Sequence, residues 1–375
     1  MKWLRILFSL VLLLIIVAAV AIGGLMYFVD PNKLRPMIVE RVMQQTGYQL
    51  AIYGKLSWSF YPNIGIQVER MTLAAPSQPD PFLDLRGVTI ASKFSELIRG
   101  NKELKGDLRI ADVRFANMRA QNASVELHWQ NNVLTMEPIT ASLYQGSLRG
   151  VAHGTNLMDI PHWDWSVALD NVALQPLLKD ANRGETKLTI TGIGQVKVAG
   201  NTKGTSREQI INNFNGVSVF NLQNGSVSGL DLNYLVQTAD AFINRQEVSQ
   251  PKNIDRTDFS SLTGSVDIKD GVASTNNLLL NSSSFVTRGQ GNFHLLEQSI
   301  DLSLQVEPQQ NIKTKWEIPV IISGDIRHPD VKVDTLELRK YVMREELGKV
   351  KEKVQDEIKK VPGKAGEILQ NLLGN

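Results

Sequence analysis

The chain has 375 residues, a net charge of +2 and no cysteine. The near-balance of charge gives no electrostatic basis for binding nucleic acid. The lack of cysteine excludes disulfides, thiol nucleophiles and cysteine-ligated zinc, and it suits a protein exported to an oxidising compartment.

The first segment contains no side chain that is charged at neutral pH from Ile6 to Val29. A helix of this length, at about 1.5 Å per residue, spans about 36 Å and can cross a hydrocarbon core of about 30 Å. Lys2 and Arg5 precede it, so residues 1–30 are predicted to be an inner-membrane anchor with a cytoplasmic N-terminus. Ala19-Val20-Ala21 also resembles a signal-peptidase site, but the apolar run continues eight residues beyond it, which favours an uncleaved anchor.

A membrane-proximal helix is predicted next, within residues 31–48. Leu34, Ile38 and Val42 recur at helical spacing over 32–46, and Gly47 is a typical helix stop. The helix is therefore expected to lie near the membrane surface or to pack on the first strands.

From residue 49 to 334 the period of the apolar residues changes to two. Ile64, Ile66 and Val68 alternate with polar residues, and the segment from Ile300 to Val306 does the same. Strict alternation is typical of an antiparallel sheet with one dry and one solvated face. The fold class predicted is mainly β with flanking helices, in which residues 49–334 form an elongated sheet.

Tight turns are predicted wherever residues that tolerate positive φ separate two alternating runs. These pairs are Asn131-Asn132, Gln145-Gly146, Asn224-Gly225 and Asp270-Gly271. The segments 220–225 and 266–271 share an apolar-x-apolar-x-Asx-Gly pattern, which suggests that one hairpin unit was reused.

Helices are predicted at three further places. Ser206 and Gln209 form a capping box, and Asp231 precedes an apolar stripe that favours a helix over 231–244. Residues 335–375 are predicted to form C-terminal amphipathic helices, with a break at Pro362-Gly363. The first of them has a narrow seam that could cap the sheet, form a dimer or lie on a membrane, and capping is the favoured interpretation. The seam residues are Met343, Leu347, Val350, Val354, Ile358 and Val361.

No catalytic, cofactor or metal site is predicted. The five histidines are scattered, and no metal-binding or nucleotide-binding motif occurs. His162 and Asp164 share one side of a strand, which we interpret as an ordinary exposed edge. Gly192-Ile193-Gly194 resembles half of a dinucleotide fingerprint, but its strand-like context favours a bulge or close strand packing.

The dry face of the sheet has two interpretations. It is either the core of a sandwich, or the open concave face of a long curled sheet. The candidate residues for such a groove are Val266, Ile268, Ile300, Leu302, Leu304, Val306, Trp316, Ile318 and Val320.

Several segments of the chain resemble the AsmA family. The most specific part is the stretch just after the anchor, and later parts of the chain are also similar to family segments. The stretches are Asp30-Pro31-Asn32, Ile38, Val42, Thr46-Gly47, Ile52–Pro62, Ile64–Ile66, Leu143–Gly150, Asn224–Leu232, Ile318–Ile326 and Pro329–Val331.

The resemblance implies an inner-membrane protein of a Gram-negative-type envelope, with its bulk in the periplasm and a role in outer-membrane biogenesis. It also implies a hydrophobic β-groove for phospholipid acyl chains, lined by the candidate residues above. A scaffold for outer-membrane protein assembly that carries no lipid is the alternative, and a hydrolase using His162 and Asp164 is a third. About 18 to 22 strands at about 4.8 Å would extend only about 85–105 Å. We expect this length to fall short of a typical periplasm. A lipid path would therefore need a periplasmic or outer-membrane protein partner, or the protein would act locally near its anchor.

Overall fold

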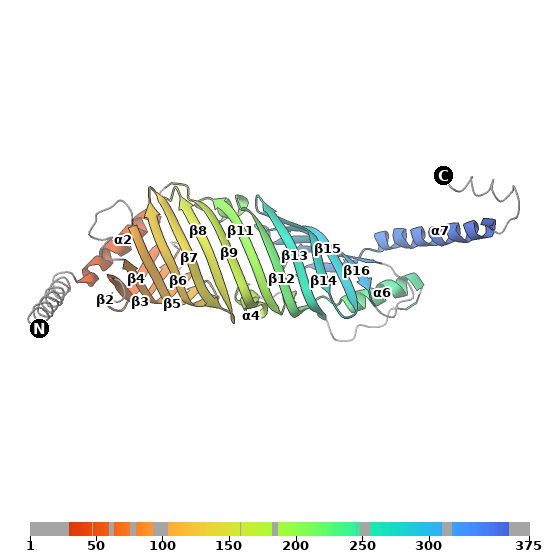
Figure 1. Cartoon of the computed structure of the whole chain (residues 1–375), viewed down its shortest axis with the longest axis horizontal. Coiled ribbons are helices and arrows are strands. Elements are labelled where there is room, and N and C mark those ends of the chain that lie inside the picture. Colours follow the sequence, from red (N-terminus) through yellow and green to blue (C-terminus); the bar gives the residue numbers. More distant parts are fainter. Residues whose placement is uncertain are drawn as a thin grey trace, which may run out of the picture. The chain divides into compact units, whose positions relative to one another are not determined.

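The computed structural model describes residues 30–46, 48–59, 64–75, 80–92, 104–157, 159–181, 187–244, 246–247, 256–309 and 317–359. The fold is mainly β, with antiparallel strands and a few helices (Figure 1). The predicted anchor at 6–29, Trp316 and the last predicted turns after Pro362 lie outside the described residues. Within the described ranges, no helix combines the length and the apolar character that crossing a bilayer requires.

The chain divides into two compact units. Unit 1 takes the described parts of residues 1–184 and 193–218, and unit 2 takes those of 185–192 and 219–375. Strand β12 (Asn215–Ser228) begins in unit 1 and ends in unit 2.

Unit 1 is an antiparallel sheet in which β1 pairs with β3, strands β3 to β9 pair in chain order, and β9 pairs with β11. The short strand β2 also pairs with β3. The bounds are β1 (Gln49–Tyr53), β2 (Ser57–Ser59), β3 (Ile64–Ala74), β4 (Leu83–Ser92), β5 (Leu104–Phe115), β6 (Met118–Gln130), β7 (Val133–Leu143), β8 (Gly146–Thr155), β9 (His162–Ala173) and β11 (Ile193–Lys203).

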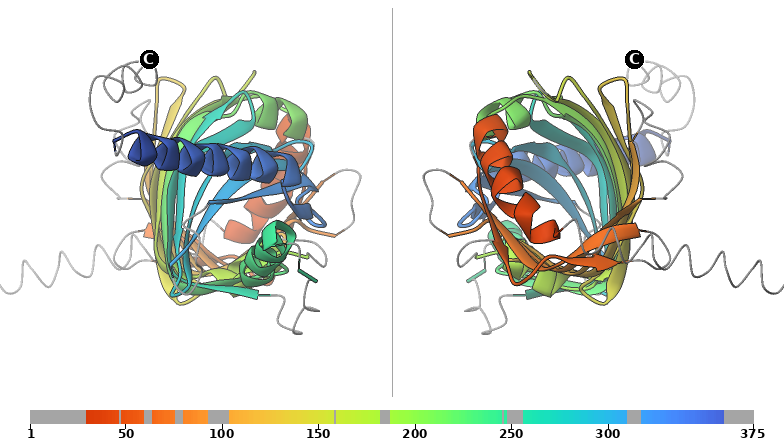
Figure 2. Two further views of the ribbon diagram at one scale, coloured as in Figure 1. Left: turned by 90° about the vertical axis from the view of Figure 1, so that its right-hand side faces the viewer. Right: turned by 90° about the vertical axis from the view of Figure 1, so that its left-hand side faces the viewer.

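The helices of unit 1 lie at the margins of this sheet. The segment predicted as a membrane-proximal helix contains a short 3-10 turn, η1 (Pro31–Lys33), and α2 (Leu34–Thr46), which packs on β1 and lies across one end of the curled strands (Figure 2, right). The Asn32 amide ties this region to the sheet, since Nδ2 donates to the Leu56 carbonyl at 3.2 Å and Oδ1 accepts from the Leu56 N–H at 3.0 Å. The other helices are α4 (Leu174–Ala181) and α5 (Arg207–Asn212).

A break in strand pairing decides which residues of unit 1 face inward. Gly87 in β4 and Asn122 in β6 have φ of 59° and 51°, and neither is paired in the register of its strand. In a regular strand Leu85 and Val88 would point to opposite faces. Here Leu85 packs against the same cluster that contains Val88. The break therefore keeps apolar residues on one face along the whole strand, and it puts Asp84 on the other.

Unit 2 contains a second antiparallel arrangement. Strand β10 pairs with β12, and strands β13 to β18 pair in chain order. The bounds are β10 (Thr189–Ile190), β13 (Arg256–Lys269), β14 (Val272–Asn281), β15 (Phe285–His294), β16 (Ser299–Pro308), β17 (Ile318–Asp325), β18 (Asp330–Val333), α6 (Leu232–Asn244) and α7 (Thr335–Lys359).

Helix α6 covers the last strands of unit 2. Asp231 caps it as predicted, because its Oδ1 accepts from the Tyr234 N–H at 2.9 Å. The helix lies against β16, β17 and β18 (Figure 2, left). Leu232 is 0% exposed, and Phe285 of β15 is 1% exposed. The best-packed part of the unit 2 core therefore lies at one end of these strands.

Three turns and one helix start follow the sequence pattern closely. Asn131-Asn132 and Asp270-Gly271 have positive φ and join neighbouring strands, which confirms two predicted hairpins. The third hairpin turns at Tyr144 and Gln145, one residue earlier than predicted. Ser206 accepts from the Gln209 N–H at 3.2 Å, as the capping box predicts.

The hairpin predicted at Asn224-Gly225 is wrong. Both residues lie inside β12, with φ of 49° at Asn224. A Cβ added to Gly225 would clash with the Thr191 carbonyl oxygen and with the Phe259 ring. The pair thus forms a local distortion where other segments approach closely, and this segment is not a copy of the hairpin at 266–271.

The seam of α7 does not cap the sheet. Met343, Leu347 and Val350 are 63%, 64% and 57% exposed. Leu338, on another side of the first turn, is 0% exposed, and α6 covers the last strands instead. The capping interpretation is therefore wrong for the described part of the seam.

Candidate functional site

The predicted groove residues of unit 2 lie on one face, in successive cross-strand rows. Ile300 pairs with Phe293, and Leu302 pairs with Ile322 on its other side. Leu304 pairs with Val320, and Val306 with Ile318. Val266 and Ile268 lie on β13 and are half-buried. Eight of the nine candidates thus lie in described strands, and Trp316 lies outside the described residues.

Burial separates these candidates into two groups. Leu304, Val306, Ile318 and Val320 are 5%, 0%, 4% and 1% exposed, so they belong to the core. The other four remain partly accessible to solvent: Val266, Ile268, Ile300 and Leu302. Only the second group can contact a ligand without unpacking the core.

Unit 1 carries a longer apolar row that sequence reasoning missed. One register row crosses eight strands, from β3 to β9 and on to β11. At about 4.8 Å between strands, the row is about 34 Å long. Its members are Ile66, Ile90, Leu108, Val125, Ile139, Gly150, Val167 and Val198.

The members of this row are all incompletely buried. Ile90 is 46% exposed, whereas Val88, two residues away on the same strand, is 1% exposed. The neighbouring register row, on the side of Ile90 that lies away from Val88, contains Leu127, Met136 and Trp165. The Trp165 ring stacks on the Phe214 ring, with 5.6 Å between the ring centroids. An extended apolar surface therefore continues beyond the compact cluster around Val88. Each residue of the row separately looks like an ordinary core position, so only the register could reveal it.

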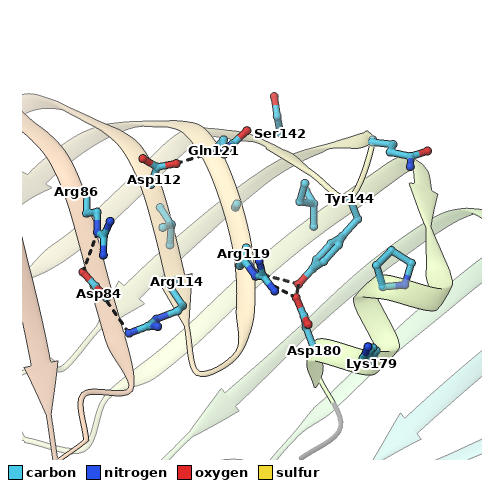
Figure 3. Close-up of a pocket in the computed structure, with 16 residues that line it drawn as sticks. Asp84, Arg86, Asp112, Arg114, Arg119, Gln121, Ser142, Tyr144, Lys179 and Asp180 are labelled. Atoms are coloured by element: carbon cyan, nitrogen blue, oxygen red, sulfur yellow. Dashed lines mark hydrogen bonds and ion pairs between the residues drawn. The ribbon is translucent and has the colours of Figure 1, made fainter.

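The opposite face of unit 1 holds a polar pocket of about 910 Å³ between strands β4 to β8 and helix α4 (Figure 3). Four cationic side chains line it, together with three carboxylates. The cations are Arg86, Arg114, Arg119 and Lys179, and the carboxylates are Asp84, Asp112 and Asp180.

Tyr144 joins the sheet to α4 in this pocket (Figure 3). Its hydroxyl donates to Asp180 Oδ2 at 2.9 Å and accepts from the Arg119 N–H at 3.0 Å. Burial raises the pKa of Tyr144, and the hydrogen bond to the Asp180 carboxylate raises it further, because both favour the neutral phenol. The phenol is therefore a structural hydrogen-bond donor at neutral pH.

Asp84 is the buried centre of an ion cluster. Its side chain is 3% exposed and lies 3.0 Å from Arg70 Nε and 3.3 Å from Arg114 Nη2, with Arg86 Nε at 3.9 Å. Burial acts to raise the pKa of Asp84, but the hydrogen bonds from Arg70 and the charges of the three arginines outweigh it and lower the pKa below its usual value. At neutral pH the Asp84 carboxylate is therefore ionised and paired with these arginines.

The residues that line this pocket can form hydrogen bonds and ion pairs. Within the described ranges, no group of three His, Cys, Asp or Glu side chains is placed to hold a metal ion. His162 and Asp164 lie 3.5 Å apart on β9 with side chains 40% and 58% exposed, and neither lines this pocket. The bulge expected near Gly192-Ile193-Gly194 is present, as a register shift between Gly194 and Val196.

The fold defines a class of mainly β proteins with antiparallel sheets that are not closed, and unit 1 has one apolar and one charged face. The chain belongs to the AsmA family, whose family model matches residues 1–105 and 94–278. Protein AsmA of Escherichia coli (strain K12) is 34% identical over 79 residues, which are 21% of this chain and 13% of that protein. The match thus spans far less than two thirds of that relative. No solved structure matches the chain.

Family membership confirms the resemblance found in the sequence.

Proposed function

We propose that this protein binds phospholipid acyl chains along the apolar face of its sheet, and thereby supports lipid transport and outer-membrane biogenesis. The observation that carries the proposal is the apolar register row of unit 1, which continues across eight strands and is incompletely buried. In unit 2, the apolar residues Ile300 and Leu302 are also partly accessible to solvent.

Binding of acyl chains requires only an apolar surface. Each CH₂ group that moves from water to an apolar surface contributes about 0.8 kcal/mol, so a single acyl chain gains several kcal/mol even when part of it stays accessible. The headgroup can remain in water. A long row without a specific polar site is therefore sufficient for a ligand with long apolar tails.

We further propose that residues 1–30 anchor the protein in the inner membrane and that the bulk lies in the periplasm. Helix α2 follows this segment and exposes Met37, Ile38 and Met43, by 61%, 38% and 45%. Large apolar side chains next to the anchor suit a position at the membrane surface, where a lipid would enter.

The test compares substitutions on the two faces of the sheet, in strand β4 and in strand β16. Ile90→Asp and Leu302→Asp place a charge on the apolar face, and Thr89→Asp and Ser303→Asp place the same charge on the opposite face of the same strands. Ile90 is already 46% exposed, so its substitution costs little folding free energy. Leu304 is a poor choice, because it is a core residue.

Native mass spectrometry of the full chain, released from lipid nanodiscs, measures the bound phospholipid. We expect phospholipid on the wild type and on the opposite-face controls, and at least a fivefold lower occupancy on both apolar-face variants. A lipid-free wild type, or equal occupancy in all four variants, contradicts the proposal. If the apolar-face variants lose lipid but still support outer-membrane protein assembly, the protein acts as a scaffold.

A further inference from the structure

Helix α7 carries an unpartnered apolar seam. Leu336, Met343, Leu347, Val350 and Val354 are 65%, 63%, 64%, 57% and 42% exposed. Their spacings are 7, 4, 3 and 4 residues, which is the heptad repeat of a coiled coil. We call these five residues the α7 seam.

No element in the described part of unit 2 covers this seam. Leu338 is 0% exposed and fixes the first turn of α7, which contacts β17 and α6. Asp334 caps the helix, since its Oδ1 accepts from the N–H groups of Leu336 and Glu337 at 3.0 and 3.1 Å. Residues two apart lie about 200° apart around a helix, so Leu336 faces away from the surface that buries Leu338. The seam is therefore directed away from the first turn's own docking surface.

We propose that the α7 seam binds the α7 helix of a second copy of this chain in an antiparallel coiled coil. A helix that lies on a membrane has a wide apolar face and a basic polar face. The seam is narrow, and the sequence of α7 contains six acidic residues beside seven basic ones. Both features fit a two-helix interface better than an anionic lipid surface.

The polar break in the seam determines the orientation. Lys340 occupies the heptad position between Leu336 and Met343, and it would face its own copy in a parallel pair. An antiparallel pair centred between residues 348 and 349 places Leu347 opposite Val350 of the second copy, and Met343 opposite Val354. The same alignment places Lys340 opposite position 357, which is a glutamate in the sequence. Apolar positions then meet apolar ones, and the one basic position meets an acidic one, twice by symmetry.

Charge reversal tests this pairing in the full chain in detergent, with the dimer dissociation constant measured by analytical ultracentrifugation. Lys340→Glu and Glu357→Lys are each expected to weaken the dimer at least tenfold, and the double variant is expected to restore it. Gly348→Asp adds a charge in the same helix away from the seam and is the control. Failure of the double variant to restore the dimer overturns the antiparallel pairing.

Disulfide trapping gives a second readout, because the chain has no cysteine of its own. A Met343→Cys copy with one tag is expected to cross-link to a Val354→Cys copy with another, and not to itself. Self-cross-linking of Met343→Cys would indicate a parallel pair. A monomeric wild type that binds anionic vesicles through Leu347 would show instead that a membrane covers the seam, and a monomer unaffected by Leu347→Asp would show that the seam has no partner. Each of these results overturns the proposal.

Discussion

Two buried threonines in unit 2 have opposite roles. Thr257 is 0% exposed, and its hydroxyl donates to the Leu230 carbonyl at 2.5 Å and accepts from the Leu232 N–H at 3.0 Å. It therefore satisfies two backbone groups at the start of α6. Thr287 is 2% exposed, and its Oγ1 has no hydrogen-bond partner among the described residues. The same side chain thus stabilises the fold at one position and carries a cost at the other.

Replacement of each threonine by the isosteric valine should separate these roles. Thr257→Val is expected to lower the free energy of unfolding by about 1–3 kcal/mol, because two buried backbone groups lose their partner. Thr287→Val is expected to be neutral or stabilising, since it removes an unsatisfied hydroxyl. Hydrogen exchange of the α6 amides in the full chain measures the difference. Equal losses of protection in the two variants would contradict the assignment.

At the scale of elements, the ion cluster around Asp84 links three neighbouring strands. Arg70 is on β3, Asp84 and Arg86 are on β4, and Arg114 is on β5. The lowered pKa of Asp84 makes this link dependent on pH. A group with a folded-state pKa below its unfolded value of about 3.9 contributes its full stabilisation above that value, and loses it as the pH falls through the folded-state pKa.

Asp84→Asn should therefore destabilise unit 1 at pH 7 and at pH 5 by the same amount, about 1 kcal/mol, because the partly exposed arginines weaken the pairing. Below about pH 4 the difference from the wild type should shrink, since Asp84 then becomes protonated in the wild type as well. Thermal unfolding at several pH values measures this. Asp112→Asn is the control, because the Asp112 carboxylate is exposed and accepts a long hydrogen bond of 3.3 Å from Gln121. A difference that persists undiminished to pH 2 would refute the role of Asp84.

At the scale of the whole molecule, a ligand that binds only the folded state must stabilise it. At a lipid concentration one hundred times the dissociation constant, the stabilisation is about 2.7 kcal/mol. Delipidated full chain is thus expected to unfold at a higher temperature when phospholipid is added, and Ile90→Asp is expected to show a smaller increase. Thr89→Asp should behave as the wild type. An unchanged unfolding temperature in the wild type would argue against a lipid ligand.

Local patterns in the sequence predicted many of the elements. The capping residues Ser206 and Asp231 are found at helix starts, and the alternation from Ile300 to Val306 is found in β16. These features depend on contacts within a few residues. The hairpin predicted at Asn224-Gly225 was wrong, because a residue with positive φ can form a distortion within a strand as well as a turn. Which of the two forms depends on the distant residues Thr191 and Phe259.

By itself, the sequence determined the mainly antiparallel strands, most of the helix positions and the family, because period, capping and motif are local properties; helix α4 (Leu174–Ala181) was not predicted. Only the tertiary structure decided which apolar residues are core and which remain accessible. Leu302 and Leu304 have the same sequence pattern, yet Leu304 is buried and Leu302 is not, because burial depends on what the rest of the fold packs against each side chain. The unit 1 row and the exposed α7 seam likewise depend on strand register and on the presence or absence of a covering element, which no local pattern encodes.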